Sequence, residues 1–166
     1  MSLESKSTLK YYAEGKTEIG YEFCYRNNLN STFLARPRTN SLRLEEAKGR
    51  GNPYYDRTCK LCKEGEEDLV HFLIECKALE GNRNYDLIDN SIGNSKDRMI
   101  KLLFQSEDYQ GTGYMVKKLW WRRKFLLTYI QELEDNSKKD EGSTSNPLAH
   151  WNSDPGPMRR GHDFPE

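Results

Sequence analysis

The sequence predicts a mainly α-helical domain with a small hydrophobic core. Apolar residues recur at intervals of three and four, most clearly in residues 114–134, and this is the spacing of one helix face. Only 35% of the 166 residues are hydrophobic while 31% are charged, so the core that the helices enclose must be modest. A compact group of three cysteines and one histidine in residues 59–76 offers the metal staple that a small core needs.

Residues 59–76 follow the pattern Cys-x2-Cys-x8-His-x4-Cys, whose members are Cys59, Cys62, His71 and Cys76. Structural zinc sites are tetrahedral, and three Cys with one His is among their ligand sets. A catalytic zinc keeps one position for water, whereas here protein would fill all four, so the pattern predicts one structural Zn²⁺ in a knuckle. His71 and Cys76 would point to different sides of an α-helix, so we expect the helix to end or loosen at Cys76.

The residues between the two halves of this pattern predict a tight turn followed by a helix. Gly65 is expected to supply the permissive backbone that closes the turn. Residues 66–68, Glu-Glu-Asp, place negative charge where the helix should begin. The alternative interpretation is that the cysteines are only small buried residues. Three of the four cysteines fall in the pattern, which favours the metal site and leaves Cys24 as a buried structural thiol.

The rest of the chain predicts short helices joined by polar loops. Pro37 is expected to end a helical turn at residues 31–35. Thr39 or Asn40 is expected to cap the next helix, which Gly49 ends. With the helix of the metal pattern set aside, the predicted helices cover residues 3–14, 17–25, 31–35, 40–48, 82–89, 95–104 and 114–134.

Composition divides the chain into four parts. A basic helical part leads into the zinc knuckle with its helix, and a second helical part follows. The last part is rich in Ser, Asn, Asp, Lys, Gly and Pro, which predicts a disordered C-terminal tail. His150 and His162 lie in this tail without ligand spacing, and we assign them no role. The four parts are residues 1–58, 59–79, 80–134 and 135–166.

The formal net charge is zero, but the charges are segregated along the chain. Between Arg36 and Lys63, eight basic residues stand against three acidic ones, a local charge of +5. The acidic run at residues 64–68 would cancel part of this charge if the two segments lie close together. A basic segment of this kind suits phosphate groups. The eight basic residues are Arg36, Arg38, Arg43, Lys48, Arg50, Arg57, Lys60 and Lys63.

The predicted helix at residues 114–134 has an apolar face and a mixed outer face. Aromatic residues between cations can stack on bases while the cations hold phosphates; alternatively, they pack against a neighbouring helix or a partner domain. Arg123 falls inside the apolar face, so it must pair or extend its charge to solvent. The apolar face holds Val116, Leu119, Trp120, Leu126, Leu127, Ile130 and Leu133. The outer face holds Lys117, Lys118, Trp121, Arg122, Lys124, Phe125 and Tyr129.

The sequence shows no targeting or membrane signal. Its first residues lack the apolar core of a signal peptide, and no run reaches membrane-spanning length. We therefore expect an intracellular protein, nuclear and/or cytoplasmic and not secreted, with no membrane partner. With three cysteines assigned to metal, a disulfide framework is not expected.

A second motif, RTNSL at residues 38–42, precedes the metal pattern by about twenty residues. The same region also contains a Glu-Glu pair at residues 66–67 and the pattern Cys-x-x-Leu from Cys76 to Leu79. The combination resembles the zinc-binding segment downstream of the polymerase in non-LTR (LINE-type) retrotransposon reverse transcriptases. The likeness covers roughly residues 5–130.

The resemblance implies an all-helical appendage whose zinc knuckle helps an upstream reverse transcriptase domain to hold template RNA and target DNA. It implies the same four metal ligands and, more loosely, nucleic-acid contacts from the two basic segments. The candidate contact residues for RNA and/or DNA are Arg36, Arg38, Arg57, Lys60, Lys117, Lys118, Trp121, Arg122 and Lys124.

The chain departs from a polymerase in one respect. A polymerase binds two metal ions through clustered carboxylates, and no Tyr-x-Asp-Asp signature occurs. We therefore expect a non-enzymatic, zinc-binding nucleic-acid-binding module, a fragment or relic of such an element. The alternative is a zinc-stabilised helical scaffold for protein interactions without nucleic-acid affinity, which zero net charge and exposed aromatic residues favour.

Overall fold

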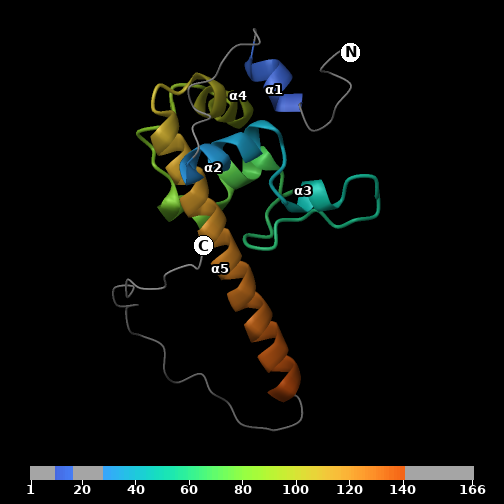
Figure 1. Ribbon diagram of the computed structural model, residues 1–166. Coiled ribbons are helices and arrows are strands. Elements are labelled where there is room, and N and C mark those ends of the chain that lie inside the picture. The colour runs from blue at the N-terminus through green and yellow to red at the C-terminus, as the bar shows by residue number, and fades with distance from the viewer. Residues whose placement is uncertain (1–9, 17–27, 141–166) are drawn as a thin grey trace, which may run out of the picture. The chain divides into compact units, whose positions relative to one another are not determined.

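The computed structural model describes residues 10–16 and 28–140, and this part of the chain is mainly helical (Figure 1). It contains no β-strand, and the predicted α-helical class is confirmed. Short π-helical and 3₁₀-helical segments stand between the α-helices. In chain order the elements are α1 (Lys10–Gly15), α2 (Leu29–Arg38), α3 (Glu45–Lys48), a π-helix (His71–Glu75), a 3₁₀-helix (Lys77–Asn82), α4 (Ser95–Ile100), a second π-helix (Lys101–Gln105) and α5 (Tyr109–Asp140).

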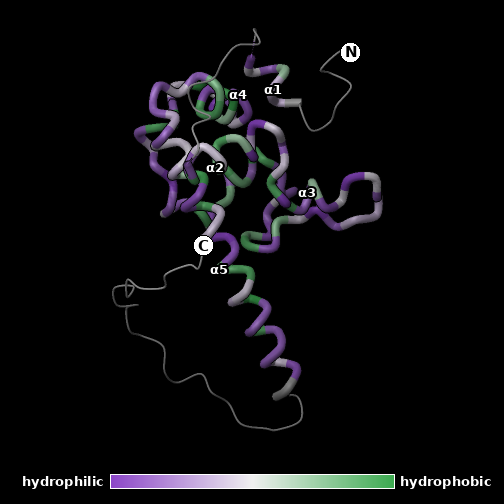
Figure 2. Tube along the Cα trace, viewed as in Figure 1, coloured by the Kyte–Doolittle hydropathy of each residue, from purple (hydrophilic) through white to green (hydrophobic). Residues whose placement is uncertain are grey.

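The chain divides into two units at Gln131, and α5 crosses this boundary. The hydrophobic core and the cysteine–histidine cluster belong to the first unit. Residues 132–138 in the second unit are exposed along the helix. Figure 2 shows hydrophobic residues in α2 and the first half of α5, and mostly hydrophilic ones in the later turns of α5.

The core joins segments that are far apart in the sequence. Its largest fully buried side chains come from α2, the loop before α3, the cysteine–histidine segment, α4 with its π-helix, and the first turns of α5. Phe72 packs edge-to-face on Trp120, with ring centroids 6.3 Å apart. The largest of the fully buried side chains are Phe72, Leu34, Leu42, Leu44, Leu69, Leu73, Leu79, Met99, Leu102, Leu103, Met115 and Leu119.

Helix α2 is longer than predicted and contains Pro37 instead of ending before it. Asn28 caps its first turn, because the side-chain oxygen accepts a hydrogen bond from the Ser31 amide at 2.9 Å. Proline breaks a helix by removing an N–H and crowding the preceding turn. Pro37 is the next-to-last residue of α2, so few backbone hydrogen bonds of the helix remain for it to disrupt.

The predicted helix over residues 40–48 is wrong for most of its length. Only α3, Glu45–Lys48, is helical, and Asn40 takes the left-handed region with φ of 46°. Thr39 ends α2 instead of starting the next helix, since its hydroxyl donates to the Ala35 carbonyl at 3.0 Å. Leu42 is buried although it lies in a bend outside any helix, so its position in the helical pattern reflected burial and not helix formation.

After the metal pattern, one of the two predicted short helices is absent and the other is present. Residues 83–89 form turns instead of the helix predicted over 82–89, and a 3₁₀-helix precedes them. The helix over residues 95–104 is confirmed as α4 with its π-helical continuation. Asn94 caps α4, because its side chain accepts from the Asp97 amide at 2.7 Å.

Helix α5 includes the predicted helix over 114–134 and extends it at both ends. Residues 135–140 therefore belong to this helix and not to the tail. Residues 141–166, which include both histidines of the tail, lie outside the described residues. The predicted helix over residues 17–25, which includes Cys24, also lies outside them, and so do residues 3–9 of the predicted helix over 3–14. No helix in the described part of the chain combines the length and apolar character needed to cross a membrane.

Candidate metal centre and nucleic-acid surface

The four predicted ligands converge in one cluster. Their ligand atoms all lie within 4.8 Å of one another, and Cys59, His71 and Cys76 are buried. The Sγ atoms of Cys59 and Cys76 are 3.9 Å apart, and Cys62 Sγ lies 3.2 Å from His71 Nε2. A tetrahedral zinc site with Zn–S of about 2.3 Å and Zn–N of about 2.0 Å places its ligand atoms about 3.5–3.8 Å apart. The cluster therefore fits a single tetrahedral metal ion.

A π-helical turn brings His71 and Cys76 onto the same site. The Cys76 amide donates to the His71 carbonyl at 2.8 Å, which is the five-residue hydrogen bond of a π-helix. Cys76 then leaves the helix with ψ of 111°. The prediction that the helix loosens and ends at this residue is confirmed. The wider turn lets side chains five residues apart share a face.

The first two cysteines lie on a loop that closes on itself. The Cys59 amide donates to the Gly65 carbonyl at 2.7 Å, and an isolated antiparallel bridge joins Thr58 to Glu66. The left-handed residue of this loop is Lys63, with φ of 61°, and not Gly65. A β-carbon on Gly65 would meet the His71 ring only at ordinary contact distance, 3.7 Å. Gly65 is therefore not required by backbone conformation, which corrects the sequence prediction.

Surrounding groups hold the ligands in place. Arg83 is buried, and its guanidinium donates to the carbonyls of Leu73 at 2.8 Å and Cys76 at 2.9 Å, which caps the end of the π-helix. Asp68 accepts from the His71 amide at 2.7 Å. These partners fix the backbone from which the ligands project. The sequence patterns gave no sign of Arg83, because it acts through carbonyls.

Hydrogen bonding within the cluster divides the charge unequally among the thiols. A hydrogen bond from Cys76 lowers the pKa of Cys59 to about 3 despite its burial. The same hydrogen bond and burial raise the pKa of Cys76. The hydrogen bond to Cys59 raises the pKa of His71, against the effect of its burial. Without a metal ion, the thiolate of Cys59 therefore opposes ionisation of Cys76, and a bound cation would allow both thiols to be deprotonated.

A buried ionic cluster connects the metal loop to α3 and α5. Arg123 is 3% exposed, and its Nε donates to Glu67 Oε1 at 2.7 Å while Nη2 contacts Glu67 Oε2. Glu45, which is fully buried, accepts from Lys48 at 2.6 Å and from the Tyr55 hydroxyl at 2.7 Å. The sequence predicted that Arg123 must either pair or extend its charge to solvent. Arg123 pairs with Glu67, because a buried guanidinium needs a carboxylate.

The basic segment of residues 36–63 does not form one surface. Arg38 is 5% exposed, its Nε donates to the Leu103 carbonyl at 2.6 Å, and its guanidinium lies over the Phe104 ring. Arg36 is exposed, and Lys60 lies 3.6 Å from Glu45. As a predicted nucleic-acid contact, Arg38 needs correction, because a side chain held in the interior cannot reach a phosphate.

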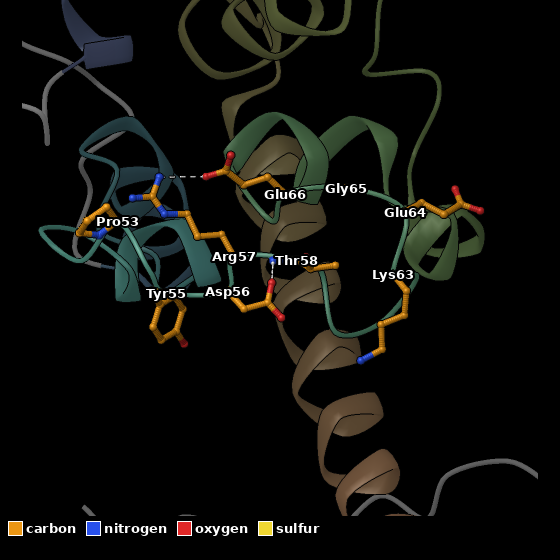
Figure 3. Close-up of a pocket in the computed structure, with 9 residues that line it drawn as sticks. All are labelled: Pro53, Tyr55, Asp56, Arg57, Thr58, Lys63, Glu64, Gly65 and Glu66. Atoms are coloured by element: carbon orange, nitrogen blue, oxygen red, sulfur yellow. Dashed lines mark hydrogen bonds and ion pairs between the residues drawn. The ribbon is translucent and has the colours of Figure 1, made fainter.

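Arg57 faces an open groove of about 710 Å³ beside the metal loop (Figure 3). Its guanidinium pairs with Glu66 at 3.2 Å and donates to the Gly49 carbonyl at 3.2 Å. Three carboxylates, those of Asp56, Glu64 and Glu66, line this groove with Arg57 and Lys63. The mixed charge does not favour a polyanion, and Arg57 serves to hold the loop.

The outer face of α5 is the cationic surface in the first unit. Between Tyr109 and Gln131 the helix carries five cations and no acidic residue, and only Arg123 among them is buried. Trp121, Phe125 and Tyr129 on this face are 52%, 60% and 51% exposed. In the described part of the chain, no carboxylate lies within ion-pair distance of the other four cations, Lys117, Lys118, Arg122 and Lys124.

Cations and rings alternate closely on this face. Lys124 Nζ lies 5.2 Å from the centre of the Trp121 ring, and the Arg122 guanidinium lies 5.5 Å from that of Phe125. On a helix, Trp121 and Phe125 share one line with a row of cations on either side. The structure thus brings together Lys117, Lys118, Trp121, Arg122 and Lys124, and separates them from the candidates of the basic segment.

Comparison with known proteins gives no relative. No family model, curated protein or solved structure matches this chain. The geometry of the cluster and the outer face of α5 are therefore the features that support a proposal about function.

Proposed function

We propose that the cysteine–histidine cluster binds one structural Zn²⁺. Three sulfur donors and one imidazole select zinc over Mg²⁺ or Ca²⁺, which prefer oxygen. All four positions are protein ligands and Cys59 and Cys76 are buried, so the ion holds the loop and does not activate water. The test is the zinc content of purified Cys62→Ser protein against Cys24→Ser, a matched thiol control. We expect one zinc per chain in the control and none in Cys62→Ser.

We further propose that this zinc-stapled domain is a non-catalytic module that binds RNA and/or DNA through the outer face of α5. The observation that carries the proposal is a helix face with exposed rings between unpaired cations and no acidic residue from Tyr109 to Gln131. Rings stack on bases of any sequence, and Lys and Arg neutralise the phosphates between them. The surface can therefore bind a strand although the whole chain is neutral.

The zinc site supports this surface indirectly. Glu67 lies in the loop between the first cysteines and His71, and it holds Arg123 on the inner face of the same helix turn as Lys124. Removal of zinc should loosen the loop and release this contact. Nucleic-acid affinity is therefore expected to require zinc even though no metal ligand touches the strand.

The decisive test compares two charge-matched variants. Lys117, Lys118 and Lys124 changed together to Ala remove three cations from the α5 face. The control changes Lys77, Lys96 and Lys101 to Ala, three exposed lysines that pair with Glu64, Glu14 and Asp89. For a single strand the salt slope should fall by about 0.7 for each lost phosphate contact, hence by about 2 in the α5 variant alone. Equal slopes in both variants would contradict the proposal.

A second candidate is a helical scaffold that binds another protein, and the exposed rings of α5 favour it. Trp121, Phe125 and Tyr129 together form an apolar stripe of a kind that also marks protein interfaces. Sedimentation at increasing concentration separates the two candidates. Self-association that Trp121→Ala abolishes, without binding of RNA or DNA at low salt, would favour the scaffold.

We also propose that the chain is a fragment or relic of a LINE-type retrotransposon reverse transcriptase, acting inside the cell beside an upstream polymerase domain. The spacing of the metal ligands and the RTNSL motif support this origin. In the fold the motif has a structural role, because Arg38 and Leu42 are buried and Thr39 ends α2. Co-purification with a separately expressed reverse transcriptase domain tests the partnership, and absence of a complex at low salt would count against it.

A further inference from the structure

A small pocket lies at one end of the α5 surface. It has a volume of about 320 Å³, near the lower limit of small-molecule pockets. Asn82 and Asn84, just after the metal segment, form one wall, and Tyr114 and Lys118 of α5 form another. Tyr114 is four residues before Lys118 and seven before Trp121, so all three share the outer face of the helix. The pocket is therefore continuous with the proposed nucleic-acid surface.

The floor of the pocket is preorganised by buried groups. Arg83 is held by its hydrogen bonds to Leu73 and to the metal ligand Cys76. Met115 is 2% exposed, and its sulfur accepts from the Asn84 amide at 3.3 Å. A ligand in this pocket would meet a surface that is already fixed, which lowers the entropic cost of binding.

The chemistry of the lining distinguishes this pocket from two others. The groove at the metal loop contains three carboxylates. A second groove, between the turn at residues 86–90 and the end of the second π-helix, contains four, whereas this pocket contains none. Tyr114 is 57% exposed and offers a ring face. Asn84 uses its side-chain oxygen to accept from the Asp86 amide, which leaves its NH₂ group to donate outward. Lys118 adds a cation at the edge.

We propose that this pocket binds one unstacked base of a single-stranded nucleic acid whose remaining nucleotides follow α5. Tyr114 would stack on the base, the carboxamides of Asn82 and Asn84 would read its edge, and Lys118 would contact the adjoining phosphate. Trp121 lies about 10 Å from Tyr114 along the helix axis and would stack on a later base. A base inside a duplex offers no free face, so a single strand is the expected ligand. This inference rests on the proposed function of α5.

The proposal also predicts a base preference. The carboxamide of Asn82 can form two hydrogen bonds with the N6 and N7 atoms of adenine, and a purine offers the Tyr114 ring a larger face to stack on than a pyrimidine does. We therefore expect the zinc-loaded full chain to bind labelled twelve-nucleotide oligo(A) more tightly than oligo(U). The oligo(dA) and oligo(dT) pair tests the same preference in DNA.

Fluorescence anisotropy with these four strands tests the pocket. Tyr114→Ala should weaken oligo(A) binding by roughly 5- to 150-fold, which is the range expected when a stacking ring is removed. Tyr114→Phe keeps the ring and should bind like wild type, and so should Tyr54→Ala, which removes a more exposed tyrosine outside the pocket. Asn82 and Asn84 changed together to Ala should abolish the difference between oligo(A) and oligo(U). Equal thermal melts establish that each variant is folded.

The outcomes separate this inference from the proposed function. If Trp121→Ala and the α5 lysine variant lose affinity while Tyr114→Ala binds like wild type, the surface stands and the pocket is overturned. Survival of the adenine preference in the double asparagine variant would also overturn it. Absence of any binding by the wild-type chain at low salt would overturn both proposals.

Discussion

The metal loop and the outer face of α5 use their polar and charged side chains in opposite ways. In and around the loop, the buried charges of Arg123, Glu67 and Glu45 are paired within the fold. On the outer face of α5, cations and rings face solvent, and their contacts there are with one another. If α5 binds nucleic acid as proposed, stability and binding are located in different parts of one small domain. Substitutions of the metal ligands or of the buried charges should destabilise the protein strongly, and those on the outer face of α5 should leave it folded but weaken the proposed binding.

The largest effect is expected from loss of a metal ligand. His71→Ala leaves three ligands and an open coordination position, and the apparent zinc affinity that contributes to folding, about 10–16 kcal/mol in small zinc domains, falls sharply. We expect loss of the cooperative thermal transition or a large fall in Tm, together with loss of bound zinc. Cys24→Ser is the control. A wild-type melting curve for His71→Ala would refute the structural role of the metal.

The next effect concerns the buried ionic cluster. Arg123→Met leaves the buried carboxylate of Glu67 without its partner, which should lower the free energy of unfolding by about 3–5 kcal/mol. Adding Glu67→Gln removes the unpaired charge and should restore part of that loss. Urea denaturation of the two variants measures the difference. If the double variant were less stable than Arg123→Met, the destabilisation would not come from an unpaired charge.

A smaller, pH-dependent effect is expected at Tyr55. Burial acts to raise the pKa of Glu45, but hydrogen bonds from Lys48 and Tyr55 with the charges of Lys48 and Lys60 outweigh it and lower the pKa below its ordinary 4.5. A carboxyl with a lowered folded pKa contributes stability above its unfolded pKa, and this is lost as the pH falls through the folded value. Tyr55→Phe should cost about 1 kcal/mol at pH 7.

This cost should shrink in acid, once Glu45 is protonated in both proteins. Urea midpoints of Tyr55→Phe and wild type from pH 7 down to pH 3 provide the measurement. A difference that stays constant over this range would show that the Tyr55 hydroxyl does not act through the Glu45 carboxylate.

A still smaller effect distinguishes Lys63 from Gly65 in the metal loop. Lys63 holds φ of 61°, a conformation that costs a non-glycine residue about 1–2 kcal/mol. Lys63→Gly removes this strain but loosens the unfolded chain, so we expect a net gain of up to about 1 kcal/mol. Gly65→Ala should change stability by less than about 0.5 kcal/mol, since no left-handed backbone or close contact stands against it. The reverse order in thermal melts would restore the sequence prediction for Gly65.

The smallest effect on stability is predicted for the α5 face. Trp121→Ala removes a half-exposed ring, so the free energy of unfolding should change by less than about 0.5 kcal/mol. Its affinity for a single strand should still fall by about 1–3 kcal/mol. Paired measurements of unfolding and anisotropy on one sample show whether the two regions are independent. A large loss of stability would indicate that Trp121 supports the fold.

The sequence was most informative where a pattern is local. The metal ligands, the loosening of the helix at Cys76 and the long helix could all be predicted from spacing, because each depends on neighbours within one turn or loop. The burial of Arg38 could not, since its partner, the Leu103 carbonyl, lies 65 residues away. Tertiary packing also overrode the helical spacing of Leu42 and Leu44, which are buried from the non-helical segment before α3.

Residues that act through the main chain were the ones that sequence analysis missed. Arg83 holds the end of the π-helix by donating to two carbonyls, and a carbonyl leaves no mark in the sequence. The sequence patterns assigned no role to Glu45 and placed Glu67 only at the start of the metal-pattern helix, and the fold places both against Arg123. An arginine within an apolar helix face was the one signal that such a cluster must exist.

The proposed function requires that a zinc-held fold presents α5 to a nucleic-acid strand. The most direct test is the anisotropy of labelled oligo(A) with the full chain across a salt series, with and without a zinc chelator. We predict tight binding at low salt that weakens steeply as salt rises, a slope smaller by about 2 in the α5 triple-lysine variant, and no binding after chelation. No binding at low salt, or one slope shared by wild type and the α5 variant, would contradict the account.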